Sequence, residues 1–140
     1  ATNPRLQFAF HQTWAYAADS KTQAFENYNK DQQFMYESIV AAVREATRRA
    51  GIRIVIPAGT AIQNGRTSFV GDRFTRDGYH LNSGVGQFTA ACVWYELLLK
   101  RPARKNPFVP AGLTPEEAAV AKKAAHKAIR HPYKITPFRD

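Results

Sequence analysis

Apolar and polar residues alternate or recur at regular spacing along the chain, and this pattern predicts most of its elements. Residues 6–10, Leu-Gln-Phe-Ala-Phe, alternate between large apolar and polar or small side chains, which predicts a short strand. Residues 11–28 follow as an aromatic-rich loop. Residues 52–56, Ile-Arg-Ile-Val-Ile, are rich in β-branched side chains and end at Pro57, which predicts a second strand.

Between the two strands, apolar side chains recur every three or four positions, which predicts an amphipathic helix. These positions are Met35, Ile39, Ala42, Val43, Ala46 and Ala50. Asn29, with Gln32 three residues later, is a plausible helix start, and Gly51 is a natural C-terminal stop. A strand, a helix and a strand form a βαβ unit, which implies parallel pairing through a right-handed crossover.

The middle of the chain combines an irregular segment with a second helix. Residues 57–82 show no clear periodicity and contain four glycines, so we expect a loop that is long enough to be a functional candidate. Asn82 or Ser83 is then expected to cap a helix that ends near Leu99. Its apolar residues cover a broad face, which predicts that the helix is well buried.

The C-terminal region is set apart by three prolines that follow Lys100. Thr114, Pro115 and Glu117 have the spacing of a capping box with proline at the first helical position, which predicts a helix that ends near Arg130. We therefore divide the chain into residues 1–101, an α/β unit, and residues 102–140, a proline-rich connector and basic helix packed on the same domain.

Composition and charge narrow the class of protein. Hydrophobic residues make up 44% and charged residues 22%, which is ordinary for a globular chain. The single cysteine, Cys92, excludes an internal disulfide framework and a cysteine-rich zinc site. The net charge of +9 is concentrated after Leu99. This excess suits either a solvated helix face or a surface for nucleic acid or another acidic polymer.

The predicted elements do not complete an α/β domain. Two strands and three helices are fewer than a covered parallel sheet contains, and they resemble the back half of a doubly wound domain. The chain lacks an initial Met, so we expect a mature, processed or truncated chain. An isolated half sheet leaves an open edge, so we expect a partner piece or a second copy of the chain.

One pair of residues in the long loop suits acid–base chemistry. Asp77 and His80 are three residues apart, in a turn that Gly78 makes possible, at the carboxyl end of a predicted strand. The carboxylate can accept the Nδ1–H of His80 and leave Nε2 free as a base. The same pair can equally serve only to fix the loop.

The residues of this segment resemble a known superfamily. Residues 56–64 (Ile-Pro-Ala-Gly-Thr-Ala-Ile-Gln-Asn), 75–82 (Thr-Arg-Asp-Gly-Tyr-His-Leu-Asn), 85–86 (Val-Gly) and 90–96 (Ala-Ala-Cys-Val-Trp-Tyr-Glu) are similar to the SGNH, or GDSL-like, hydrolases, in a branch of bacterial proteins. The resemblance covers the second half of that superfamily's domain. It implies a flavodoxin-like, three-layer parallel sheet, with His80 as catalytic base and Asp77 as its orienting group.

The resemblance also implies an activity that this chain cannot perform alone. The superfamily's nucleophilic serine lies in an N-terminal Gly-Asp-Ser or Gly-Asn-Ser block, which is absent here, as are the blocks of its oxyanion hole. The four serines, at positions 20, 38, 68 and 83, lie in no such motif. We therefore expect the C-terminal part of a serine ester hydrolase, inactive by itself, whose parent protein acts on carbohydrate esters such as acetyl groups. The resemblance implies no cofactor, no metal and a periplasmic or secreted location.

Weaker candidates surround this pair. Trp14 and Tyr16 suit stacking on a sugar ring or core packing, and Gln63 and Asn64 suit binding of substrate hydroxyl groups or turn formation. The alternative function is a non-catalytic module that binds nucleic acid or acidic glycan through its basic C-terminal region. Aromatic residues are not interleaved with those cations, which makes nucleic acid the less favoured partner. No membrane-spanning run is present in the sequence.

Overall fold

Two short parallel strands lie between helices in the computed structural model, which describes residue 3 and residues 5–138. β1 (Ala9–His11) pairs with β2 (Ile54–Ile56) in parallel, with Ala9 opposite Ile54 and His11 opposite Ile56. The α-helices are α1 (Gln32–Ala50), α2 (Ala58–Arg66), α3 (Val85–Leu99) and α4 (Pro115–Arg130). Two 3-10 helices are η1 (Gln23–Tyr28) and η2 (Ala103–Lys105). The chain is thus of the α/β class, and the βαβ prediction is confirmed.

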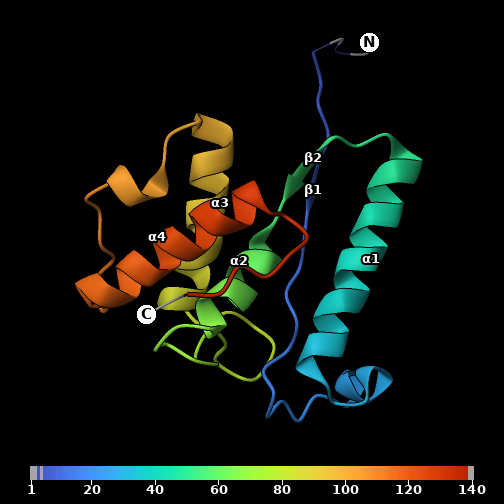
Figure 1. The fold of residues 1–140 in the computed structure, drawn as a ribbon, viewed down its shortest axis with the longest axis horizontal. Helices are drawn as coiled ribbons and strands as arrows, with labels where there is room; N and C mark the ends of the chain where they lie inside the picture. Colours follow the sequence, from blue (N-terminus) through green and yellow to red (C-terminus); the bar gives the residue numbers. More distant parts are fainter. Residues whose placement is uncertain (1–2, 4, 139–140) are drawn as a thin grey trace.

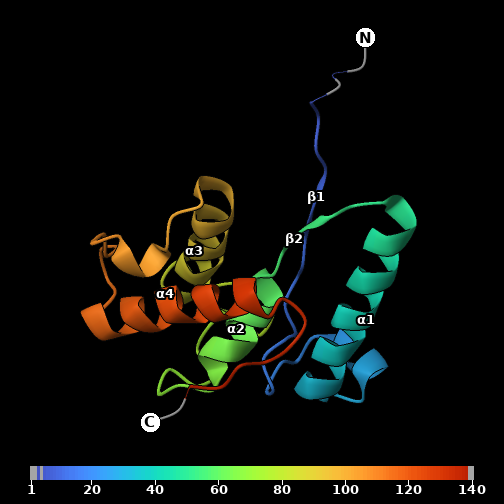
Figure 2. The ribbon, with the colours of Figure 1, turned by 45° about the horizontal axis from the view of Figure 1, so that its top comes forward.

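The helices lie on two sides of the strand pair. Figure 1 shows α1 on one side and α2, α3 and α4 on the other, and Figure 2 shows the same separation after rotation. Phe10 and Val55 pack towards the α1 side, against the buried residues Met35 and Ile39. Ile56 packs towards the α3 and α4 side. Alternation of side chains along each strand therefore directs the two helical layers to opposite sides.

Both strands are shorter than the sequence predicts. The expected strand over residues 6–10 begins at Ala9, and the expected strand over residues 52–56 begins at Ile54. Leu6 and Phe8 remain exposed, so the apolar alternation extends beyond the paired residues. Only three residues of each strand are paired with the neighbouring strand. The ends of a strand are defined by this pairing, which the pattern of apolar residues does not reveal.

The start of α1 is also corrected by the structure. Asp31, not Asn29, is the N-cap, and its Oδ1 accepts a hydrogen bond from Phe34 N at 2.9 Å. Asn29 instead adopts a left-handed conformation, with φ of 56°, that ends η1. Gly51, with φ of 65°, ends α1 as predicted. The two caps together fix the length of the crossover helix.

Residues 57–82 do not form one long loop as the sequence predicts, because Ala58–Arg66 form the helix α2. Every residue from Ala58 to Gly65 is buried, so this helix has no solvent-facing side, and Ile62 is the only large apolar residue among its nine. Gly59 allows α2 to approach the end of β1, because a Cβ atom there would lie 1.9 Å from Thr13 O. Gln12 Oε1 accepts a hydrogen bond from Thr60 N at 2.9 Å and fixes the same contact.

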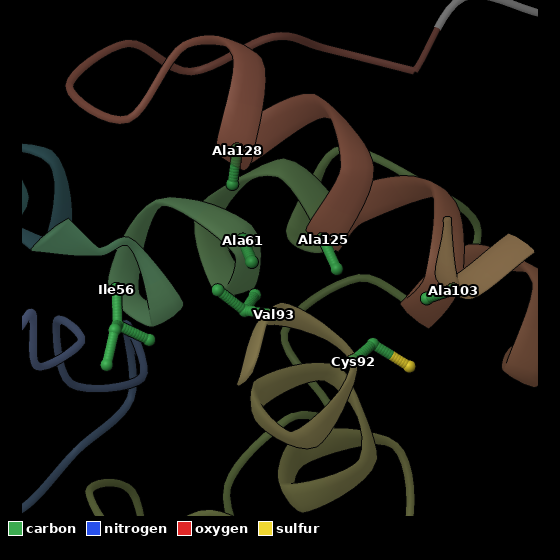
Figure 3. Packing of buried hydrophobic residues seen from close by; sticks show 7 residues of the cluster. All are labelled: Ile56, Ala61, Cys92, Val93, Ala103, Ala125 and Ala128. Atoms are coloured by element: carbon green, nitrogen blue, oxygen red, sulfur yellow. The ribbon is translucent and has the colours of Figure 1, made fainter. Parts of the chain in front are cut away.

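Small side chains let α2, α3 and α4 pack closely, and Figure 3 shows their shared cluster. Its members are Ile56, Ala61, Cys92, Val93, Ala103, Ala125 and Ala128. The capping box of Thr114 and Glu117 at the start of α4 is confirmed. After α4 the chain returns to α2, where Thr136 N donates to Asn64 Oδ1 at 2.7 Å and Phe138 N donates to Thr67 Oγ1 at 2.9 Å.

Candidate active site

The loop that carries Asp77 and His80 is closed by its own backbone. Thr75 and Leu81 form an antiparallel bridge, and Arg76 N donates to His80 O at 2.9 Å. Gly78 sits at the turn with φ of 90°, and a Cβ atom there would lie 2.8 Å from Ser20 Oγ. Glycine is therefore required by both conformation and space.

Asp77 holds His80 in a defined orientation. Its Oδ2 lies 2.7 Å from His80 Nδ1, and its Oδ1 accepts the backbone N–H groups of His80 at 2.8 Å and Tyr79 at 3.2 Å. The side-chain hydrogen bond to His80 and the backbone donors lower the pKa of Asp77 to about 2, against a smaller opposing effect of desolvation. The carboxylate is ionised at neutral pH and accepts the Nδ1–H, which directs Nε2 away from Asp77. The predicted hydrogen bond is confirmed.

The segment that follows β1 supports this loop from one side. Trp14 Nε1 donates to Tyr79 O at 2.7 Å, and Ala17 N donates to Gly78 O at 2.8 Å. The Tyr79 ring lies 3.9 Å from the His80 ring and 5.8 Å from the Tyr16 ring, between centroids. Trp14 and Tyr16 thus lie next to the Asp77–His80 loop, and both are half-buried. Their contacts position the loop, and stacking on a sugar stays a prediction.

Gln63 and Asn64 do not lie in a loop, and this expectation is corrected. Both belong to α2 and are buried. Asn64 is fully buried; its Nδ2 donates to Ala124 O and its Oδ1 accepts Thr136 N. Gln63 Oε1 accepts a hydrogen bond from Arg66. The Asn64 amide joins α2 to α4 and to the C-terminal segment, a placement that offers no polar atom to a substrate.

A buried ion pair beside the site was not predicted from the sequence. Arg66 Nε lies 2.6 Å from Asp72 Oδ1, and the Arg66 side chain is 5% exposed. Asp72 Oδ2 also accepts hydrogen bonds from Ala18 N at 2.7 Å and Gln32 Nε2 at 3.0 Å. Burial lowers the pKa of Arg66, and Asp72 opposes that shift. Hydrogen bonds from Arg66 to Ala15 O and from Ala18 N to Asp72 tie the pair to the segment after β1. No periodicity or motif in the sequence indicates these contacts between residues 51 and 54 positions apart.

A surface cavity of about 860 Å³ adjoins the loop on the Asp77 side. Its lining includes Arg76, Asp77, Gly78, Lys21 and Glu117, but His80 is not part of it. In the part of the chain that the structure describes, no serine hydroxyl hydrogen-bonds to His80.

Other kinds of site have no support among residue 3 and residues 5–138. No group of three or more His, Cys, Asp or Glu side chains in these residues is placed to hold a metal ion. Nor does any helix formed by them have the length and apolar character needed to cross a membrane. Cys92 is buried, and burial raises the pKa of its thiol to about 12, so the thiolate is not available at neutral pH.

Comparison with known proteins places the chain in a family. No curated protein matches it. A crystal structure of a DUF4886 family protein from Bacteroides uniformis ATCC 8492 is similar to it, with 48% sequence identity and a TM-score of 0.94. That match covers 96% of this chain and 52% of the other, so the chain spans about half the length of the solved relative. Residues 1–128 match the family described as a domain of unknown function, DUF4886. The chain belongs to the DUF4886 family.

Proposed function

We propose that this chain supplies the base and its orienting carboxylate to a serine ester hydrolase of the SGNH type, with His80 and Asp77 in these roles. The observation that carries the proposal is the three-point acceptance by Asp77, from His80 Nδ1 and from two backbone N–H groups. A carboxylate fixed in this way holds the imidazole in one tautomer and stabilises the imidazolium that forms during acyl transfer.

The proposed reaction moves one proton from the serine hydroxyl to His80 and then to the leaving alcohol. A serine hydroxyl from the rest of the parent protein loses its proton to His80 Nε2 while its oxygen attacks the acyl carbon. His80 donates that proton to the oxygen of the leaving alcohol, which we propose is a sugar hydroxyl, and the ester bond breaks. Water repeats both steps and releases the acid. The fold proposed for the parent is the doubly wound, three-layer sheet, of which β1 and β2 form one part.

The test compares this chain with a longer DUF4886 protein on a small activated acetyl ester. The 140-residue chain is expected to show no hydrolysis above buffer, whereas the longer protein hydrolyses the ester. In the longer protein, replacing the residues aligned with His80 by Ala and with Asp77 by Asn is expected to lower kcat/KM by about 10³–10⁴-fold. Hydrolysis by the verified 140-residue chain that is lost in His80→Ala would refute the fragment interpretation, and an inactive longer protein would refute the activity.

A second candidate function rests on a basic pocket that does not include His80. A pocket of about 410 Å³ is lined by Arg101, Lys105 and Tyr95, among others. Neither cation forms an ion pair with a described residue. A single aromatic ring beside two cations offers no series of platforms on which successive bases could stack, so an acidic glycan is favoured over nucleic acid. Binding of a sulfated oligosaccharide that weakens steeply with salt, and that is lost in Arg101→Ala with Lys105→Ala, would support this candidate.

A further inference from the structure

A small pocket between α3, α4 and η2 includes neither Asp77 nor His80. Its volume is about 200 Å³, and a dry apolar cavity of roughly 150 Å³ is large enough to hold benzene. Figure 3 shows one part of its wall, where the Cys92 side chain points from α3 toward Ala103 of η2. We call this space the α3–η2 pocket. Most of its lining is aromatic or small and apolar: Phe88, Ala91, Cys92, Tyr95, Ala103 and Phe108.

The aromatic side chains of the α3–η2 pocket suit a flat, apolar ligand. The Phe88 and Phe108 rings make an edge-to-face contact, with centroids 6.1 Å apart and planes inclined by 65°. Phe108 is 61% exposed, so its ring lies at the mouth of the pocket, whereas Tyr95 is half-buried. Aromatic side chains pack against a further ring in offset or edge-to-face arrangements. The pocket therefore offers partners for the body of a ring-shaped ligand.

One cation lies in this apolar wall. Lys122 is 8% exposed, and its Nζ donates to Asn106 O at 2.6 Å and lies 5.9 Å from the centroid of the Phe88 ring. Both partners line the pocket, which places the ammonium at its wall. An ammonium has three N–H donors, and among the residues that the structure describes this one has no second acceptor and no ion pair. A buried ammonium is costly unless an anion accompanies it.

The two acidic groups on the facing side of α3 do not serve as that anion. Glu96 Oε1 lies 2.6 Å from His126 Nδ1, and Glu96 Oε2 accepts a hydrogen bond from Ala103 N at 2.9 Å. Both carboxylate oxygens thus have other partners. Burial raises the pKa of the Cys92 thiol to about 12, and the charge of Lys122 opposes that shift only in part, so the thiol is neutral. The counter-ion of Lys122 must come from outside the lining of the pocket.

We propose that the α3–η2 pocket binds a small aromatic carboxylate, with its ring against Phe88 and Phe108 and its carboxylate on Lys122. The carboxylate accepts the N–H donors that Asn106 O leaves free, in a charge-assisted contact that apolar surroundings strengthen. The pocket is smaller than the roughly 300–1,000 Å³ of sites for drug-sized ligands, which limits the occupant to one ring with its acid group. This binding needs neither His80 nor Asp77, so it goes beyond the proposed function and does not depend on it.

The experiment titrates benzoate into this chain and follows Cys92 by NMR after selective ¹³C labelling of cysteine, since the chain has one cysteine. We expect a saturable shift of the Cys92 Cβ signal, with a Kd on the order of 1 mM or below. Benzyl alcohol carries the ring without the charge, and acetate carries the charge without the ring. Each is expected to bind at least about tenfold more weakly than benzoate, because each lacks one of the two contacts.

Lys122→Met tests the ammonium, because it removes the charge and keeps an apolar side chain. The preference for benzoate over benzyl alcohol is expected to fall below about twofold. The matched control is Lys123→Met, which removes the same charge from the next residue of α4. Lys123 Nζ lies 4.8 Å from the centroid of the Phe138 ring and does not line the pocket. The control is expected to change the affinity for benzoate by less than about twofold, because distant exposed charges are screened.

Ala91→Leu tests the pocket without removing the ammonium, because Ala91 is exposed and lines it. The larger side chain fills part of the space and is expected to weaken benzoate and benzyl alcohol alike, by at least about fivefold. This variant still tests the site if Lys122→Met loses the contact with Asn106 and does not fold. The proposal would be overturned by the absence of a saturable Cys92 shift at about 10 mM benzoate, by equal affinities for benzoate and benzyl alcohol, or by equal losses in Lys122→Met and Lys123→Met.

Discussion

Asp77 accepts a hydrogen bond from the His80 side chain, and the same carboxylate also shapes the backbone of the turn. Its two oxygens accept three donors, two of which are backbone N–H groups of Tyr79 and His80. The sequence spacing predicts the side-chain contact, since i and i+3 meet in a glycine turn. It does not predict that the neighbouring support comes from Trp14, because that contact joins residues 65 positions apart.

At the residue scale, the first prediction concerns the titration of Asp77. Its pKa of about 2 in the folded chain lies below the ordinary value of 3.8, so the associated stabilisation is present above about pH 4 and is lost as the pH falls towards 2. In His80→Ala the strongest cause is removed, and the pKa is expected to rise towards 3.8. Carbon-detected NMR titration of the Asp77 carboxyl measures both values. An unchanged pKa in His80→Ala would mean that the backbone donors alone hold it down.

A second residue-scale prediction uses two glycines with positive φ. Gly78→Ala combines a left-handed conformation with a Cβ that would lie 2.8 Å from Ser20 Oγ, whereas Gly71→Ala has φ of 60° and open space. Gly71→Ala is expected to cost about 1–2 kcal/mol of unfolding free energy. Gly78→Ala is expected to cost about 1–3 kcal/mol more, because of the added contact. Urea denaturation of both variants gives the difference, and equal costs would contradict the contact with Ser20.

Among the elements, amphipathic helices were predicted well and the fully buried one was missed. α1 and α4 present an apolar stripe to one core, so spacing reveals them. α3 is apolar on most of its surface, which predicts that it is well buried, but only five of its fifteen residues are buried and Trp94, Leu98 and Leu99 are exposed, so that expectation is wrong. α2 is enclosed on all sides and uses Gly, Thr, Gln and Asn residues to contact backbone and side chains of other elements. With nine residues, two of them Gly and only Ile62 large and apolar, α2 is too short and too poor in large apolar side chains for an apolar stripe to be recognised in the sequence.

At the element scale, the contact between α2 and the end of β1 is expected to be intolerant of side chains. A Cβ at position 59 would lie 1.9 Å from the backbone oxygen of Thr13, whereas one at position 84 would lie 3.2 Å from the flexible end of Leu113 and 3.5 Å from Asn82 Oδ1. Gly59→Ala is expected to cost about 3 kcal/mol or more, and Gly84→Ala clearly less, because its contacts are with side chains that can move. Chemical denaturation measures both. A mild effect of Gly59→Ala would show that α2 can move away from Thr13 at little cost.

For the whole molecule, the exposed apolar surface decides whether the chain is expected to be stable as a monomer. The fold class follows from the sequence because strand, helix and strand were each recognisable. The two-stranded size of the sheet does not follow from the sequence, because apolar alternation extends beyond the three residues of each strand that are paired. Two strands with three residues each offer few backbone hydrogen bonds to hold a sheet together. Most of the packing between elements joins α2, α3 and α4.

The corresponding prediction is that the chain is not a self-sufficient monomer. Light scattering joined to denaturing electrophoresis is expected to show either a second polypeptide or self-association, because exposed apolar groups such as Leu98 and Leu99 favour contact. A single monomeric species of 15.7 kDa that unfolds cooperatively would show that these residues form a complete domain.

Because α2 is enclosed by other elements, we expect it to be among the last helices to fold. Gln12, near one end of the sequence, and Thr136, near the other, both hydrogen-bond to this nine-residue helix. Its polar side chains have their partners only after both distant segments have arrived, which makes it a late and non-local element. Amide protons of α2 are therefore expected to exchange with solvent only through global opening, whereas those at the exposed end of α3 exchange through local fraying. Hydrogen exchange monitored by mass spectrometry separates the two, and clipping of residues 132–138 is expected to accelerate exchange in α2 first.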